Sequence, residues 1–401
     1  MSQAFPSFDG AISRTVLEQY LGRSITMSSL AESSTLDDDF RMLRNIGAKF
    51  VGRAAYVWSQ DRDEESHFRR AMEVICKYRS LDQDTVFQAA IFEAVAAHVT
   101  SREFVPAWVF EEFGLPVETR TFQYEDMLYD AGCLPGPVVK WRPHAGNDWM
   151  RDYFGDSSVP DMSKVETQMW FYYRARRYID IGFEALHLGQ VHLMNANDPD
   201  CRHWWSLLER IRGYARKHAR RHHVILDAHT HGIALADGRL LFDFHSYPQH
   251  IKDVVERPGQ GVLEAGFRHA IYGQSLGGLT PSGWECESLP YLVEFDNYGS
   301  SGQPDVHLDE RMWVWGCDEI SWFARQPESY RNEYLRYAWL RVPELDPNGF
   351  LQMPGARVLA EPAQGLDRYR ANTRSAACPD GFGQEETIKE IWDSCPRPGG
   401  R

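Results

Sequence analysis

Carboxylate side chains recur in the apolar, strand-like segments of this 401-residue chain. Glu294 and Asp296 lie in the run from 289 to 297, two residues apart, so they share one face of a strand. Asp227 lies near the end of an earlier apolar run, residues 223–229. Glycosidic bond cleavage needs paired carboxylates in one cleft, one to protonate the leaving oxygen and one to attack the anomeric carbon or activate water. Asp227, Glu294 and Asp296 are therefore the candidate reacting groups.

Other polar residues lie at similar positions along the predicted strands. Most lie several residues into a strand, and parallel α/β folds keep their active sites at the carboxyl ends of the strands. One tryptophan adds a ring on which a sugar can stack. The candidate substrate-binding residues are Arg53, Glu93, His187, Gln190, His229, Asp318, Glu319 and Trp322.

Glu184 is a different case, although it belongs to a clear strand. It follows Gly182 by only two residues, so it lies low on the strand, at the level of Lys49 on another strand. We expect a buried Lys49–Glu184 pair on the floor of the fold, away from the reacting groups.

A repeated helix, glycine, strand pattern positions these residues. A helix over 163–181 ends at Gly182 before a strand over 183–190, and a helix over 37–46 ends at Gly47 before a strand over 49–58. Further strands are predicted at 86–95, 223–229, 240–245, 289–297 and 312–319, with 124–129 as the candidate for the third. Further helices are predicted at 64–78, 102–113, 201–222 and 327–340.

This alternation predicts an α/β protein, an irregular (β/α)8 (TIM) barrel with long loops. We assign residues 1–35 to an N-terminal extension, 36–342 to the barrel, and 343–401 to a C-terminal extension packed on the barrel. The loops 114–160 and 246–288 are expected to form the walls of the site.

Composition excludes several classes of partner. The net charge is −14 and no basic tail offsets it, so neither nucleic acid nor an anionic membrane is an expected partner. The 7 cysteines have no paired spacing, which argues against a disulfide framework or a zinc ribbon. With no signal-like start and no apolar run of membrane-spanning length, we expect a cytoplasmic protein. The 13 Trp, 18 Tyr and 21 Phe fit either a large core or a ring-lined ligand cleft.

Residues from roughly 37 to 340 resemble the (β/α)8 barrels of glycoside hydrolases. The resemblance lies in architecture and in the placement of carboxylates, with no family-specific motif. A large superfamily of retaining enzymes in that group places its acid after the fourth strand and its nucleophile at the end of the seventh. Glu294, in Tyr-Leu-Val-Glu-Phe-Asp, suits the second role, while His187 and Gln190 stand where the acid would be. The resemblance implies a hydrolase acting on a small or oligosaccharide substrate, without a cofactor.

Two alternatives remain open. The first is a metal-dependent hydrolase similar to the amidohydrolases, because Asp227-Ala-His-Thr-His231 contains a His-x-His pair and Asp318 could complete a metal site. The second is a barrel that binds carbohydrate without catalysis.

Overall fold

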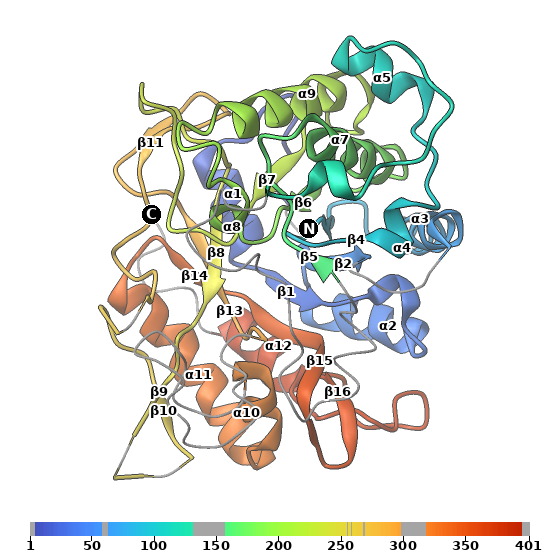
Figure 1. The fold of residues 1–401 in the computed structure, drawn as a ribbon. Coiled ribbons are helices and arrows are strands. Elements are labelled where there is room, and N and C mark those ends of the chain that lie inside the picture. Colours follow the sequence, from blue (N-terminus) through green and yellow to red (C-terminus); the bar gives the residue numbers. More distant parts are fainter. Residues whose placement is uncertain are drawn as a thin grey trace.

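The computed structural model describes residues 5–57, 63–130, 157–254, 256–257, 259–267, 269–297 and 318–394. It is a mixed α/β structure in which strands run through the middle of the molecule and helices lie around them (Figure 1). None of the helices in these ranges is both long and apolar enough to span a bilayer.

Parallel strands dominate the structure. The large sheet has the order β16-β15-β1-β2-β3-β6-β7, and a smaller sheet has the order β14-β13-β8. All neighbouring strands in both sheets are parallel except β15 and β16. The strands of the two sheets are β1 (Ser24–Met27), β2 (Phe50–Tyr56), β3 (Val86–Ala90), β6 (Ala185–His187), β7 (Ile225–Asp227), β8 (His245–Pro248), β13 (Tyr291–Glu294), β14 (Gly349–Leu351), β15 (Met353–Ala363) and β16 (Leu366–Arg370).

Two short links connect these sheets. A parallel bridge joins His229, just after β7, to Ser246 in β8. At the other side, β14 leads into β15 with only Gln352 between them. The series of strands therefore runs from β1 through β7, by the bridge to β8 and by pairing to β13 and β14, and continues along the chain into β15, which pairs with β1.

The helices connect successive strands. Several begin at a side-chain cap; Asp63, for example, accepts from the backbone N–H of Ser66 at the start of α3. The helices are α1 (Arg14–Leu21), α2 (Leu36–Ile46), α3 (Glu64–Arg79), α4 (Ala97–Thr100), α5 (Ala107–Phe113), α7 (Val165–Asp180), α8 (Val191–Met194), α9 (Arg202–His218), α10 (Glu319–Arg325), α11 (Glu328–Leu345) and α12 (Glu385–Ser394). Short strand pairs outside the two sheets are β4 (Val95–Ala96) with β5 (Ser157–Ser158), β9 (Lys252–Asp253) with β10 (Gly261–Val262), and β11 (Gly278–Leu279) with β12 (Glu285–Cys286).

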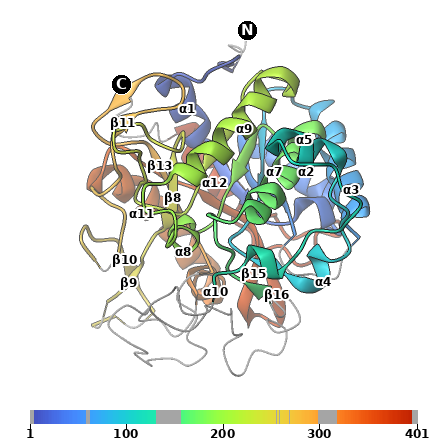
Figure 2. The ribbon, with the colours of Figure 1, turned by 45° about the horizontal axis from the view of Figure 1, so that its top comes forward.

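One apolar cluster joins residues from seven strand segments. Phe50 begins β2 and Phe244 precedes β8, two strands that are not neighbours, yet their rings meet edge to face at 5.7 Å. The N-terminal segment and α1 cover this cluster with Phe8, Ile12, Leu17, Tyr20 and Leu21, and Figure 2 shows α1 near the N-terminus at one end of the molecule. We call the strand residues of the cluster the floor layer: Phe50, Val86, Ala185, Ile225, Phe244, Leu292 and Phe350.

The side chains two residues further along each strand form a second layer. A period of two places them on the same face as the floor layer, and except for Gly52 they are polar. A Cβ atom at Gly52 would lie 2.7 Å from Nε2 of Gln352 and 3.3 Å from Oε1 of Gln88, so only glycine leaves room for these two amides. We call this set the site layer: Gly52, Gln88, His187, Asp227, Ser246, Glu294 and Gln352.

Several strand predictions were wrong. Residues 124–129 contain a short 3-10 helix, Glu125–Met127, and β3 pairs directly with β6 without an intervening strand. Asp318 caps α10 and Glu319 begins it, so neither lies on a strand, while 312–317 lies outside the described residues. The strand expected at 240–245 begins only at His245.

Strands also occur near both ends of the chain, where none was predicted. β1 lies within residues 1–35 and pairs with β2 and β15, and β15 lies within 343–401. β1 has only four residues, the shortest length at which alternation of polar and apolar positions indicates a strand, so the pattern is weak.

Glu184 lies at the amino end of β6, low in the fold as predicted, but its partner was predicted wrongly. Its carboxylate accepts from Arg220 at 2.9 Å and Arg221 at 2.8 Å, and Arg79 lies 3.6 Å away. Lys49 instead pairs with Asp82 at 2.7 Å.

Candidate functional site

Glu294 and Asp296 lie in a buried network of charges at the carboxyl end of β13. Arg53 donates to Oε1 of Glu294 at 2.7 Å and to Asp296 at 3.3 Å. Arg357, from β15, donates to Oε2 of Glu294 at 3.2 Å and also contacts Asp296. His229 Nε2 lies 2.8 Å from Oε1 of Glu294. Two carboxylates and two guanidinium groups thus form one compact set.

The surrounding charges keep both carboxylates ionised. Burial alone would raise the pKa of Glu294, but Arg53 and His229 outweigh it and lower the pKa to about 2. For Asp296, Arg357 and Arg53 likewise outweigh burial and hold the pKa well below its usual range.

Arg53 reaches this position through an irregular stretch of β2. Its backbone has a φ of 54°, in the left-handed region that residues other than glycine rarely adopt. The register between β2 and β3 shifts between Val51 and Ala55, which marks a bulge. The backbone N–H of Arg53 donates to Oε1 of Gln88 at 3.1 Å, which holds the bulge in place.

Asp227, at the end of β7, has a different environment. Its carboxyl group binds Nε2 of Gln88 at 2.6 Å, Nδ1 of His187 at 2.8 Å and the hydroxyl of Ser246 at 2.8 Å. Burial raises the pKa of Asp227 to about 8, although the hydroxyl of Ser246 acts in the opposite direction. Asp227 is therefore protonated at neutral pH, while Glu294 is ionised.

Aromatic rings connect the two parts of the site. The imidazoles of His187 and His229 lie 4.6 Å apart, centroid to centroid. Phe92, which follows β3, contacts the ring of His187 at 5.8 Å and lies under the guanidinium of Arg53 at 5.7 Å. His229 thus touches both Glu294 and the ring that is bound to Asp227.

Glu93 and Gln190 form a separate pair beside this cluster. The backbone N–H and the side-chain amide of Gln190 donate to the two oxygens of Glu93 at 2.9 and 3.0 Å. Gly189 makes this possible, because a Cβ atom there would lie 2.0 Å from Oε2 of Glu93.

Asp318, Glu319 and Trp322 contact mainly other parts of the protein. Asp318 accepts from the backbone N–H of Ser321 at 2.6 Å, and burial raises its pKa to about 6. Glu319 accepts from the backbone N–H groups of Gln249, Ile251 and Asp296, and burial raises its pKa to about 8. Trp322 is only 4% exposed and packs edge to face on Tyr334 at 5.1 Å. These three residues hold α10 and the loop after β8 against the end of β13.

The His-x-His pair does not converge on one point. Nε2 of His229 lies against Glu294, whereas Nε2 of His231 lies 2.8 Å from the backbone oxygen of His269. Within the described ranges, no group of three or more His, Cys, Asp or Glu side chains is arranged to hold a metal ion.

Four polar residues of the site were missed in the sequence. Gln88, Ser246 and Gln352 follow floor-layer residues by two positions, so the period of two could have revealed them once the floor layer was known. Arg357 had no such signal, because β15 was not predicted as a strand.

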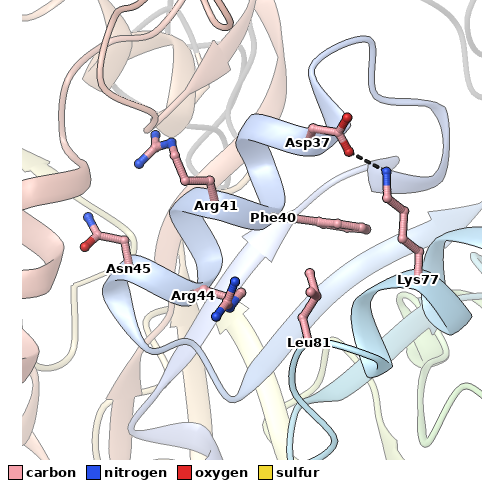
Figure 3. Close-up of a pocket in the computed structure, with 7 residues that line it drawn as sticks. All are labelled: Asp37, Phe40, Arg41, Arg44, Asn45, Lys77 and Leu81. Atoms are coloured by element: carbon pink, nitrogen blue, oxygen red, sulfur yellow. Dashed lines mark hydrogen bonds and ion pairs between the residues drawn. The ribbon is translucent and has the colours of Figure 1, made fainter.

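A pocket of about 440 Å³ lies elsewhere, between α2 and α3 on the outer surface (Figure 3). Its charged groups are largely matched: Lys77 contacts Asp37, and Arg41 binds Asp38 and Glu385. This pocket contains none of the candidate site residues.

No family model and no curated protein matches the chain. Among solved structures, an isomaltulose synthase from Erwinia rhapontici NX5 in complex with sucrose has a TM-score of 0.29 at 9% identity, covering 57% of this chain and 45% of that one. A beta-galactosidase from Bacillus circulans sp. alkalophilus has a TM-score of 0.36 at 12% identity, covering 82% and 49%. The alpha-glucosyl transfer enzyme XgtA has a TM-score of 0.34 at 9% identity, covering 76% and 64%. The chain thus spans less than two thirds of the length of each of these sugar-processing enzymes.

Proposed function

We propose that the protein is a glycoside-cleaving enzyme built on a closed (β/α)8 barrel, with the site layer at the bottom of its active site. Closure is supported by the succession of parallel neighbours from β1 through β8 and β13 to β15. It is also supported by the contact between Phe50 and Phe244, because the strands β2 and β8 can meet through their side chains only across a shared interior.

The observation that carries the proposed chemistry is the different surroundings of two buried carboxyl groups: guanidinium groups bind Glu294, whereas Gln88, His187 and Ser246 surround Asp227. Glu294 has a pKa of about 2 and Asp227 a pKa of about 8. Carboxyl groups whose environments drive their pKa values apart divide into an acid and a base or nucleophile. Glu294 would attack the anomeric carbon or activate water, and the proton for the leaving oxygen would come from Asp227.

The charges around Glu294 suit an uncharged substrate such as a sugar. Arg53 and Arg357 are balanced by Glu294 and Asp296, so no surplus charge remains to attract an ion. The side chains of His229 and Asp296 are 10% and 13% exposed, more than the other members of the network. We assign them, with Gln190, to contacts with the hydroxyl groups of the substrate.

Hydrolysis of a panel of aryl glycosides of different sugars tests this function. The wild type should release the aryl alcohol from at least one of them, and Glu294→Gln should lose this activity while keeping its fold by circular dichroism. A matched control is Glu390→Gln, since Glu390 is an exposed residue of α12 and its side chain pairs with Arg336. Equal activity of the wild type and Glu294→Gln would refute the assignment.

A protein that binds sugars without cleaving them is the second candidate. It is favoured by the enclosure of Glu294, whose side chain is only 2% exposed and has Arg53, Arg357 and His229 as partners. In this case, sugar binding measured by calorimetry persists in Glu294→Gln and neither form turns over.

A further inference from the structure

The imidazole of His187 is bound on one side only. Nδ1 lies 2.8 Å from Oδ2 of Asp227, and both side chains are 1% exposed. Nε2 is buried as well, yet it has no hydrogen-bond partner among the residues that the structure describes. A buried polar atom without a partner costs free energy, and among the described side chains of the site layer His187 is the one that has such an atom. A partner that arrives with the substrate would account for it.

Asp227 has the opposite arrangement. Gln88, His187 and Ser246 surround its carboxyl group, so a substrate cannot reach it without displacing one of them. Among these three, only His187 can accept a proton at one atom and release another at a second atom.

We infer that His187 is the catalytic residue that delivers the proton to the leaving group, and that Asp227 is a positioning and proton-supplying residue behind it. This assignment rests on the proposed function, since it concerns the acid of the same reaction. In this assignment Asp227 does not protonate the leaving oxygen directly. The imidazole of His187 transfers the proton instead.

The transfer conserves atoms and charge. Before reaction, Oδ2 of Asp227 carries a proton directed at Nδ1 of His187, and Nε2 of His187 carries the second proton. As the glycosidic C–O bond breaks, the anomeric carbon bonds to the carboxylate of Glu294, or to a water whose proton Glu294 takes. At the same time Nε2–H passes its proton to the leaving oxygen and Nδ1 takes the proton from Asp227. The imidazole stays neutral and changes tautomer, Asp227 becomes a carboxylate, and the leaving group departs as an alcohol.

The surroundings favour these protonation states. Burial, with further contributions from Arg53 and His229, lowers the pKa of His187 well below its usual value, so the imidazole is neutral. Glu294 and Asp296 act in the opposite direction but do not overcome burial. The titratable and charged groups that act on the pair from the neighbouring strands are Arg53, His229, Glu294 and Asp296.

Leaving-group dependence provides the kinetic test. Dinitrophenol departs without protonation and a simple alcohol does not, so loss of the acid should affect only the poor leaving group. His187→Asn keeps an amide near the position of Nδ1, which can accept from Asp227 through its oxygen, and removes Nε2. We expect it to lose roughly 10²- to 10⁴-fold in kcat/KM on alkyl glycosides and only a few-fold on dinitrophenyl glycosides.

His218→Gln, at the exposed end of α9, serves as the control. An equal loss on both substrates, or full activity on both, would overturn the role of His187.

A second measurement does not depend on turnover or on a variant. Nitrogen NMR of the imidazoles in the wild type should show His187 protonated at Nε2 below about pH 8 and at Nδ1 above it, as Asp227 ionises. His245 is the internal control. It is buried, and its Nδ1 donates to Ser275, whose hydroxyl donates to the backbone oxygen of Leu289. Its tautomer should not change.

These two tests separate the inference from the proposed function. A His187 that stays protonated at Nδ1 on both sides of pH 8 overturns the transfer even if glycosides are cleaved. A wild type that cleaves no glycoside overturns the proposed function, while the tautomer change still reports whether His187 and Asp227 exchange a proton.

Discussion

A buried glutamate lies among arginines at each end of the parallel strands, but one end is covered by other residues and the other is partly exposed. At the amino end, Glu184 is bound by Arg220 and Arg221, and the N-terminal segment covers the floor layer beside them. At the carboxyl end, Glu294 is bound by Arg53 and Arg357, and its neighbour His229 is partly exposed. The same type of ion pair thus stabilises the fold at one end and, on our proposal, prepares a reactive group at the other.

The floor layer and the site layer explain why the two ends differ. The floor layer is apolar and excludes water from the interior of the strands, so polar groups above it lie in a medium of low polarity. The surroundings therefore shift the pKa values of two site-layer carboxyl groups in opposite directions. Arginines lower the pKa of Glu294, and burial raises the pKa of Asp227. A shift of two residues along a strand thus separates apolar side chains that pack from polar side chains that form charged and hydrogen-bonded contacts.

Removing the charge at the carboxyl end should have the largest effect. Glu294→Gln is expected to lower kcat/KM on a cleaved aryl glycoside on the order of 10⁴-fold, equivalent to about 5.5 kcal/mol, because the ionised oxygen that attacks or activates water is gone. Steady-state kinetics measure this loss. A loss below tenfold would mean that the two ends do not differ in the way proposed.

The same substitution at the amino end should affect stability instead. Glu184→Gln leaves Arg221 and Arg79 without a carboxylate in a largely buried place, which should cost about 3 to 5 kcal/mol in the free energy of unfolding. Urea unfolding gives this value. Because Glu184 lies below the floor layer, kcat of the folded variant should match the wild type, and a large drop in kcat would contradict the comparison.

A floor-layer substitution sharpens the comparison on a single strand. Leu292 lies two residues before Glu294 and is 1% exposed. Leu292→Ala should lower the free energy of unfolding by roughly 3 kcal/mol, as expected for a cavity in a packed core. The pH profile of any activity of the folded variant should keep its shape. Changed apparent pKa values would mean that the floor layer takes part in setting the charges above it.

The sequence predicted the elements with strong patterns. Helices α2, α3 and α7 lie within two residues of their predicted bounds, because each combines an apolar face with a polar or glycine boundary. The carboxylates Asp227 and Glu294 became candidates because acidic residues in apolar runs are rare and conspicuous, and the structure brings both into the site layer. What the sequence did not predict depended on long-range pairing: β1 and β15 lie more than three hundred residues apart and pair with each other. Arg357 follows from that pairing alone, so no local pattern could have placed it beside Glu294.

The pH dependence of stability distinguishes the two carboxyl groups of the site layer. Asp227 has a folded-state pKa of about 8, above the value of 3.8 for the free side chain. Between these values the unfolded chain has released this proton and the folded protein has kept it, so stability falls as pH rises. Its contribution to the slope is at most about 1.4 kcal/mol per pH unit.

Asp227→Asn should remove this contribution, because an amide does not titrate. Subtracting the variant's unfolding free energies from those of the wild type between pH 5 and pH 8 isolates Asp227, since other groups with raised pKa values, such as Glu319, are present in both proteins. Glu294 adds nothing to the slope in this window, because it is ionised in both the folded and the unfolded states. A difference that does not change with pH would mean that Asp227 is already ionised in the folded protein. Glu294 and Asp227 would then carry the same charge, and the division into acid and nucleophile at this end of the strands would fail.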